Sequence, residues 1–441
     1  MTQPKGEVLS GAAQKWGPVL LGEGVSKKNM SVYLLCAVFT MLFSTFIPQA
    51  QPYILTEILR IPQSQQGVLS GYLGFAATLV GLVMPGVWGT LSDRSGRRFV
   101  YAAGYLVCAL GIALYPLAGS LVLLYVFRMI FAAGSNANNT MNTALLGDYV
   151  NNKDRGKAFG INAMSGGVGA LLTVFFFLRL PAMFQGGGLS TQAAGQATYW
   201  VVAGLAVAAA VIALLGLMGQ TSRQRQEKRK FTQIAADALN AARKDSGISL
   251  AYGVMFVASG ALTVIGTFFT LWIVTYGTTK AGLSSADALA RAGMIMGICQ
   301  IMGLIASPIF GVLADKLNRF RAVTLATGLT AVVFSLTLLV SDPLSGLMIV
   351  VGLLLGFVQI SGIITGGALI AQQSPEDVRG SVMGFYQFCG ALGTMLVSVL
   401  GGWLFDRWLY QGPFVLVAIL SAIVAVWGIL VYQSKAQKGA K

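Results

Sequence analysis

The stretch Gly89-Thr90-Leu91-Ser92-Asp93-Arg94-Ser95-Gly96-Arg97-Arg98 is a short charged turn between two long apolar runs. A fainter copy, Gly311-Val312-Leu313-Ala314-Asp315-Lys316-Leu317-Asn318-Arg319-Phe320-Arg321, lies half a chain later between two further apolar runs. One such turn would be a weak signal, because any protein with several membrane spans needs charged connections. Two copies in equivalent places indicate a duplicated architecture.

The composition indicates a protein whose solvent is lipid. Of the 441 residues, 55% are hydrophobic and only 10% are charged, whereas a soluble protein carries roughly 25% charged residues. Histidine is absent, which removes a common metal ligand and the usual proton switch of physiological pH. The four cysteines all lie inside apolar runs without a CxxC pair. We therefore expect buried thiols and no disulfide, metal site or cofactor.

Long apolar runs predict the membrane spans. A hydrocarbon layer about 30 Å thick needs about 20 apolar residues in a helix, and twelve runs meet or approach that length. Because twelve is even, both termini are expected on one side. The predicted spans are 30–56, 66–91, 99–118, 120–146, 157–179, 198–218, 248–276, 287–313, 321–340, 345–371, 381–404 and 411–433.

Basic residues predict which side holds the termini. Most lysines and arginines fall in alternate loops that begin with the N-terminal segment; the opposite side holds Arg60, Arg179, Lys280, Arg291 and Arg407. Basic loops resist translocation, so the rich side is predicted to be cytoplasmic. This distribution accounts for the formal net charge of +15 without a nucleic-acid partner. We expect an integral protein of a bacterial inner membrane with both termini in the cytoplasm.

The longest cytoplasmic connection divides the chain into two sets of six spans. It begins with a basic run, 223–230, after which apolar residues from Phe231 to Ala242 recur at helical spacing. That spacing predicts a short amphipathic helix on the inner leaflet, either with a regulatory or lipid-specific role or as a solvated linker. The expected divisions are a cytoplasmic tail (1–29), an N-terminal six-helix bundle (30–218), the linker (219–247), a C-terminal six-helix bundle (248–433) and a cytoplasmic tail (434–441).

A second pair of motifs supports the duplication. Arg155-Gly156 after the fourth span matches Arg379-Gly380 after the tenth span. Because six spans separate the copies and six is even, both halves run the same way through the membrane. The sequence therefore predicts a parallel repeat about an axis along the membrane normal.

These motifs resemble those of the major facilitator superfamily. Its diagnostic pattern, Gly-x-Leu-x-Asp-Arg-x-Gly-Arg-Arg between spans two and three, is complete from Gly89 to Arg98. The resemblance covers nearly the whole chain except the first 29 residues and the linker. It implies an all-α integral membrane fold of twelve helices in two parallel six-helix repeats, a monomer embedded in membrane lipid, and transport of a small-molecule solute by alternating access.

The charged turns are candidates for a gate on the cytoplasmic side. Ion pairs that form when this side closes would hold the protein open to the outside. The alternative is that these charges only satisfy the positive-inside bias, but that bias does not explain Asp93, Asp315, Gly89 and Gly96. The candidate gate residues are Gly89, Asp93, Arg94, Gly96, Arg97, Arg98, Asp148, Arg155, Asp315, Lys316, Arg319 and Arg379.

Arg128 lies inside the apolar fourth span and is the leading candidate for solute binding. A charge there costs several kcal/mol unless it is paired or hydrated. The same span is rich in amides, which either line a cavity or join helices; the resemblance makes spans one, four, seven and ten the walls of a central path. The candidate binding residues are Arg128, Ser135, Asn136, Asn139, Asn142, Gln49, Thr45, Thr267, Trp272, Gln300, Gln359, Tyr386 and Gln387.

Together these features favour a secondary transporter of a small organic solute. No aspartate or glutamate lies in the middle of a span, which weakens proton coupling and leaves the coupling ion open. Arg128 could attract an anionic solute, as in a uniporter or an anion exchanger. The alternatives are a multidrug or metabolite exporter of the same family and a lipid-handling or sensor protein on the same fold. No catalytic or phosphate-binding motif is present, so an enzyme is not expected.

Overall fold

The computed structural model describes residues 14–151, 154–218 and 231–439. These residues contain twelve helical segments long and apolar enough to cross a membrane, each at a predicted position with its ends within seven residues of those predicted. In lipid every backbone polar group needs an internal partner, and an α-helix provides these partners within one segment. The basic run 223–230 lies outside the described residues.

The N-terminal half contains seven α-helices, and a π-helical turn, η1 (Ile54–Ile58), extends the first of them. Ser120 and Ser190 cap two of these helices by accepting a hydrogen bond from the first turn. The helices are α1 (Lys27–Tyr53), α2 (Gln63–Ser95), α3 (Arg97–Leu114), α4 (Leu121–Tyr149), α5 (Arg155–Phe175), α6 (Leu180–Gly186) and α7 (Thr191–Gly216).

The C-terminal half repeats this arrangement after a connecting helix. A π-helical turn, η5 (Val264–Phe269), again interrupts its first span. The helices are α8 (Phe231–Lys244), α9 (Ser246–Thr263), α10 (Thr270–Thr279), α11 (Ser285–Lys316), α12 (Arg319–Ser335), α13 (Gly346–Val358), α14 (Ser361–Gln373), α15 (Arg379–Arg407) and α16 (Gly412–Gly439).

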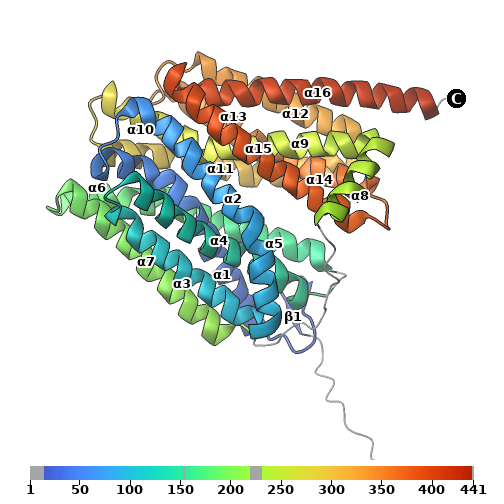
Figure 1. Cartoon of the computed structure of the whole chain (residues 1–441), viewed down its shortest axis with the longest axis horizontal. Helices are drawn as coiled ribbons and strands as arrows, with labels where there is room; N and C mark the ends of the chain where they lie inside the picture. Colours follow the sequence, from blue (N-terminus) through green and yellow to red (C-terminus); the bar gives the residue numbers. More distant parts are fainter. Residues whose placement is uncertain (1–13, 152–153, 219–230, 440–441) are drawn as a thin grey trace, which may run out of the picture.

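Figure 1 shows the two halves as two helical layers, with α1–α7 in one and α9–α16 in the other. Strand β1, α8 and the C-terminus lie at one end of the bundle, which we call the terminal side, and the opposite end is the far side. The charged turns after α2 and α11 lie at the terminal side, as do Arg155 and Arg379, which begin α5 and α15. The predicted twelve-helix fold is confirmed.

Glycines set the backbone contacts within each half, and the contacts are equivalent in the repeats. Gly169 of α5 faces the carbonyl oxygen of Val38 on α1, where a Cβ would collide with it. Gly393 of α15 faces the carbonyl oxygen of Phe256 on α9 in the same way. Small residues of this kind let membrane helices approach closely. The duplication therefore extends from the sequence motifs to the packing of the helices.

The N-terminal segment is more than the polar tail that was predicted. Strands β1 (Lys15–Trp16) and β2 (Val19–Leu20) form a hairpin, and Leu21 bridges to Val150 in the loop after α4. The side chains of Val19 and Leu21 are buried. The alternating buried residues dock this part of the segment onto the N-terminal half.

Asp154 anchors the hairpin to the loop between α4 and α5. Its Oδ2 accepts a hydrogen bond from the Leu20 amide at 3.0 Å, and its Oδ1 pairs with Lys157 Nζ at 2.8 Å. The Lys157 hydrogen bond, with that of the Leu20 amide, holds the pKa of Asp154 below its usual range. This carboxylate therefore remains charged at neutral pH and ties the first segment of the chain to the start of α5.

The linker helix α8 forms where it was predicted. Its apolar face does not lie only on lipid, however, because Ala238 and Ala241 are buried and α8 contacts α9 and α15. Leu239 remains 44% exposed. Small side chains on this face allow α8 to dock closely on the bundle. The amphipathic spacing in the sequence fits a helix docked on protein as well as one that lies on lipid, so it could not decide between them.

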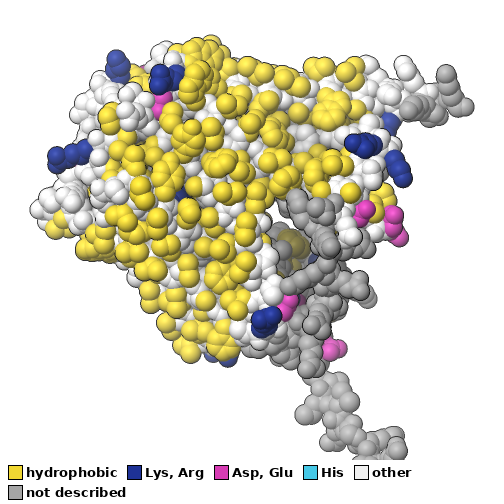
Figure 2. Space-filling model, in the orientation of Figure 1, with side chains coloured by type: hydrophobic (Ala, Val, Ile, Leu, Met, Phe, Trp, Pro, Cys, Tyr) yellow, Lys and Arg dark blue, Asp and Glu magenta, His cyan; other side chains and the backbone are white. Residues whose placement is uncertain are grey.

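Hydrophobic side chains cover the outside of the bundle. Figure 2 shows them over both halves, with basic residues toward the ends of the molecule. Large apolar residues such as Val122 and Leu215 are 72% and 79% exposed. Exposed apolar surface of this extent is stable when lipid covers it. The protein is an integral membrane protein.

Candidate functional site

A cavity of about 890 Å³ lies between the two halves. Both halves contribute to its wall through α1, α2, α4 and α5 on one side and α9, η5, α11, α14 and α15 on the other. Apolar walls come from residues such as Met41, Leu262, Ile265 and Leu304. A concave, mostly apolar site with a few polar groups is the usual form of a small-molecule site.

The two halves meet at the far side of this cavity. Gly293 of α11 faces the Val174 carbonyl of α5 so closely that a Cβ would collide with it. Gln63 Nε2, at the start of α2, donates a hydrogen bond to Thr278 Oγ1 of α10 at 3.2 Å. Figure 2 shows the surface hollowed between the halves toward the terminal side. The cavity is therefore closed at the far side in this structure.

Arg128 is the one charged residue that lines the cavity within the described part of the chain. It comes from the first half of α4, and its side chain is buried at 7% exposure. Its Nε and Nη1 atoms have no hydrogen-bond partner, although the guanidinium lies 5.7 Å from the ring centre of Phe131. A buried guanidinium with unpaired donors is costly, and an anion in the cavity would relieve that cost.

Neutral polar groups surround Arg128 in the cavity wall. Gln49 Oε1 of α1 is also buried without a partner. Ser44 and Ser135 share a hydrogen bond of 2.9 Å between α1 and α4, and Gln359 Nε2 donates to Gln300 Oε1 at 3.3 Å. These groups provide donors and acceptors from both halves around one positive charge.

The structure brings most of the predicted binding residues together in one cavity. These are Arg128, Ser135, Asn136, Gln49, Thr45, Thr267, Gln300 and Gln359. Five predicted residues do not line it: Asn139, Asn142, Trp272, Tyr386 and Gln387.

The excluded residues have identifiable surroundings. Trp272 is buried against the ring of Phe414, 5.7 Å away between centres, because the π-turn η5 precedes it and rotates the following helix face relative to an α-helical projection. Asn139 Nδ2 donates to the Ser135 carbonyl of its own helix. The Tyr386 hydroxyl is buried near Gly366, and Gln387 is exposed. Asn142 Oδ1 is buried without a hydrogen-bond partner among the described residues, away from the residues that line the cavity.

Several small polar residues of the cavity were not predicted. All of them are serines or threonines. Because these residue types are common in the spans, residue type alone did not mark them as part of a cavity. Their position beside predicted residues at helical spacing, as for Ser307 seven residues after Gln300, is the pattern that could have found them. They are Thr78, Ser259, Ser307, Thr394 and Ser398.

The charged turn of the N-terminal half makes its contacts within that half. Arg97 forms an ion pair with Asp148: its Nε lies 2.5 Å from Asp148 Oδ2, and its Nη2 donates a hydrogen bond to Asp148 Oδ1 at 3.4 Å. Gly96 has a φ of 93°, which side-chain-bearing residues rarely adopt, and it allows α3 to begin directly after α2. Asp93 and Arg94 are exposed, without an ion pair in the described part of the chain.

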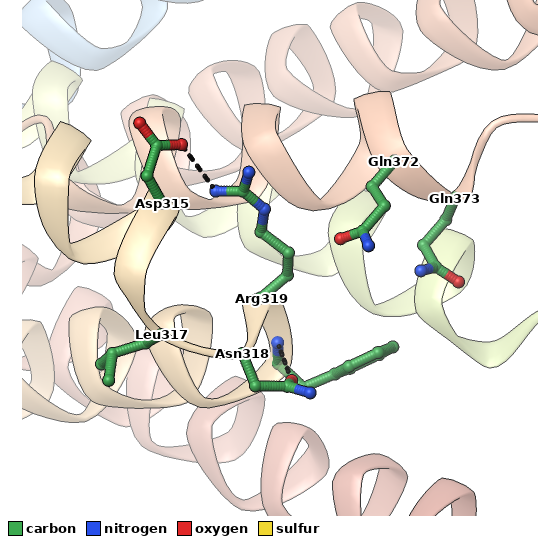
Figure 3. Close-up of a pocket in the computed structure, with 7 residues that line it drawn as sticks. Asp315, Leu317, Asn318, Arg319, Gln372 and Gln373 are labelled. Atoms are coloured by element: carbon green, nitrogen blue, oxygen red, sulfur yellow. Dashed lines mark hydrogen bonds and ion pairs between the residues drawn. The ribbon is translucent and has the colours of Figure 1, made fainter.

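The turn of the C-terminal half is arranged similarly. Arg319 Nη1 lies 3.1 Å from Asp315 Oδ1 and also donates to the Ala314 carbonyl. Figure 3 shows these residues beside a polar pocket of about 270 Å³ that also includes Gln372 and Gln373 of α14. Unlike the central cavity, this pocket is formed by one half alone.

The second pair of motifs has equivalent contacts in the two halves. Arg155 Nη2 donates to the Gly147 carbonyl at 3.4 Å, and Arg379 Nη2 donates to the Ala371 carbonyl at 2.9 Å. Each arginine thus binds a carbonyl near the end of the preceding span. Lys316 and Arg98 lie beside these turns; the Arg98 guanidinium lies 4.8 Å from the ring centre of Phe99.

Two repeated helical bundles around a central cavity that closes at one side define a membrane transporter rather than an enzyme. The chain belongs to the major facilitator superfamily, whose family model matches residues 33–342 and 304–441. The resemblance drawn from the Gly89–Arg98 turn is thereby confirmed.

Individual relatives are similar along most of the chain. The magnetosome protein MamH of Paramagnetospirillum magneticum is 25% identical over 94% of this chain and 94% of its own length. A multi-drug resistance efflux pump PmrA homolog of Lactococcus lactis is 26% identical over 93% of this chain and 96% of its own. The crystal structure of a mutant of the nucleoside transporter NupG has a TM-score of 0.75 over 91% of this chain and 99% of that one, at 13% identity, and supports the fold alone.

Proposed function

We propose that this protein is a secondary transporter that carries a small anionic organic solute across a bacterial inner membrane by alternating access. Arg128 carries the proposal, because its guanidinium is buried in the cavity wall with unpaired donors. An anionic group can accept charge-assisted hydrogen bonds from these donors and replace the hydration that burial removed.

The orientation of the chain is part of the proposal. Basic residues gather in the loops of the terminal side, and such loops resist translocation. We therefore assign the terminal side, with both termini, to the cytoplasm. In this assignment the structure has its cavity open toward the cytoplasm and closed toward the outside.

The mode of coupling follows from the cavity wall. None of its described residues is a carboxylate or histidine that could exchange a proton with the solute. A uniporter or an exchanger of one anion for another is therefore favoured over a proton symporter.

The test is a flux assay with the full-length protein in sealed liposomes. We expect labelled carboxylates or phosphate esters from a metabolite panel to exchange across the membrane. Arg128→Gln should weaken solute binding by about 10- to 100-fold, the loss expected for one charge-assisted hydrogen bond. Arg291→Gln is a matched control, because Arg291 is exposed and outside the cavity. Flux of Arg128→Gln equal to that of the control would contradict the proposal.

Export of lipophilic compounds is a second candidate. The apolar walls of the cavity favour it, and a relative is named as a multi-drug efflux pump. The charge of Arg128 would repel lipophilic cations, so any exported compounds should be neutral or anionic. Resistance of a drug-sensitive host to neutral lipophilic drugs upon expression of this protein, without exchange of carboxylates or phosphate esters in liposomes, would favour the exporter and count against the anion transporter.

A further inference from the structure

A side chain of one half binds the backbone of the other half at the far side. The carboxylate of Asp406, at the end of α15, accepts a hydrogen bond from the Gly67 amide at 2.9 Å and from the Val68 amide at 2.7 Å. Both amides lie in the second turn of α2. We call this arrangement the Asp406 contact.

Glycines bring the two backbones close enough for the Asp406 contact. A Cβ at Gly67 would lie 2.6 Å from Asp406 Oδ1, and a Cβ at Gly71 would collide with the Ser398 carbonyl. A Cβ at Gly402 would collide with the Gly67 carbonyl. Helices α2 and α15 thus touch backbone to backbone over the two turns of α15 that precede the carboxylate.

The surroundings make the carboxylate a strong polar link between the halves. Charge-assisted hydrogen bonds are roughly twice as strong as neutral ones, and Asp406 makes two of them. By comparison, the hydrogen bond from Gln63 to Thr278 at the same side joins two neutral groups at 3.2 Å. The side chain of Asp406 is half-buried, so water can replace the amides once the helices separate.

From this geometry we propose that Asp406 is a gating residue that stabilises the far-side-closed state. Opening the cavity toward the far side must separate α2 from α15 and break both hydrogen bonds. The carboxylate then becomes hydrated, while the Gly67 and Val68 amides lose their anionic partner. The contact sets the equilibrium between the two orientations of the cavity, and it rests on the alternating-access part of the proposed function.

The experiment measures distances between spin labels on the full-length protein, without any solute. One pair of labels, at Ser64→Cys and Leu409→Cys, reports the far side. A second pair, at Ser95→Cys and Gln372→Cys, reports the terminal side; all four positions are exposed. Cys389, the one described cysteine that is not buried, is replaced by serine.

Asp406→Asn keeps the shape of the side chain and removes its charge. We expect the ratio of far-side-open to far-side-closed molecules to rise at least about 10-fold, with the far-side distance longer and the terminal-side distance shorter. Arg407→Gln, an exposed neighbour on the same helix, should leave both distances unchanged. If Asp406→Asn is not folded by gel filtration, Gly71→Ala tests the contact from α2 and should shift both distances the same way.

Unchanged distances in the folded variant overturn the proposal, as does an equal shift in Arg407→Gln. The readout needs no solute, so it separates two failures. If the distances shift in Asp406→Asn but no anion is transported, the gating role of Asp406 stands and the proposed anionic solute is refuted.

Discussion

At the residue scale, the charged side chains of the turn after α2 are either exposed or paired within their own half. Asp93 is exposed and has no ion pair within the described residues, while Arg97 is held by Asp148 of its own half. A Cβ at Gly89 or Gly311 would meet no atom within 4 Å. These candidate gate residues thus have free space around them in this structure. This is expected if their partners approach only when the terminal side closes.

Asp93→Asn should shift the protein further toward the terminal-side-open state. The substitution removes no contact from the present structure but removes the charge available to a closed terminal side. Labels at Ser95→Cys and Gln372→Cys check this by their distance distribution. Glu23→Gln, an exposed charge on the same side, serves as the control. We expect a longer distance between the two labels in Asp93→Asn. An unchanged or shorter distance would refute the gate assignment of Asp93.

The residue scale also marks the limit of prediction from sequence. Arg128 was predictable, because a charge in an apolar run is itself the signal. Asp406 was not, because an acid at the end of a span is unremarkable until α2 of the other half is placed beside it. Trp272 was misplaced because a π-turn has no strong sequence signature, yet one extra residue per turn changes which face meets the cavity.

At the scale of elements, the spans were predictable because hydropathy is a local property. The N-terminal hairpin was not, because its apolar residues are few and its partner is the loop that follows α4. Asn29 Nδ2, at the start of α1, donates to the Gly216 carbonyl at 2.8 Å and links α1 to the end of α7. The hairpin and the contact between α1 and the end of α7 therefore stabilise the terminal side of the N-terminal half, where the charged turn lies.

Leu21→Ala should loosen the hairpin without unfolding the bundle. Leu21 is 1% exposed, and the loss of a buried leucine side chain costs about 2–5 kcal/mol. Hydrogen exchange of the hairpin amides should therefore become at least about 30-fold faster. Exchange in Glu23→Gln should match the unmodified protein. Equal exchange rates in the two variants would show that the segment is not held by its buried side chains.

At the scale of the whole molecule, the two halves are joined closely at the far side and meet around the cavity. Backbone contacts between α5 and α11 and between α2 and α15 form two seams of this junction. These seams close the far side in this structure, and they must separate when the halves rock as rigid bodies to open it, because each half keeps its own core and its own charged contacts.

Linking the halves at the far side should trap the cavity open toward the terminal side. Gln63→Cys and Thr278→Cys place two thiols where side chains already touch, and a short, cleavable thiol cross-linker would join them. We expect flux to stop, solute binding from the terminal side to remain, and a reducing agent to restore flux. The two single-cysteine variants control for labelling itself. Undiminished flux in the cross-linked protein would exclude a transport cycle in which the halves separate at this junction.

The hairpin at the N-terminus also constrains the order of biosynthesis. Its bridging partner Val150 and its anchor Asp154 follow the fourth span. A nascent chain cannot complete the hairpin's docking until four spans and the next loop have left the ribosome. Residues 15–20 are therefore synthesised well before their docking partners, and they are among the later parts of their half to reach their final place.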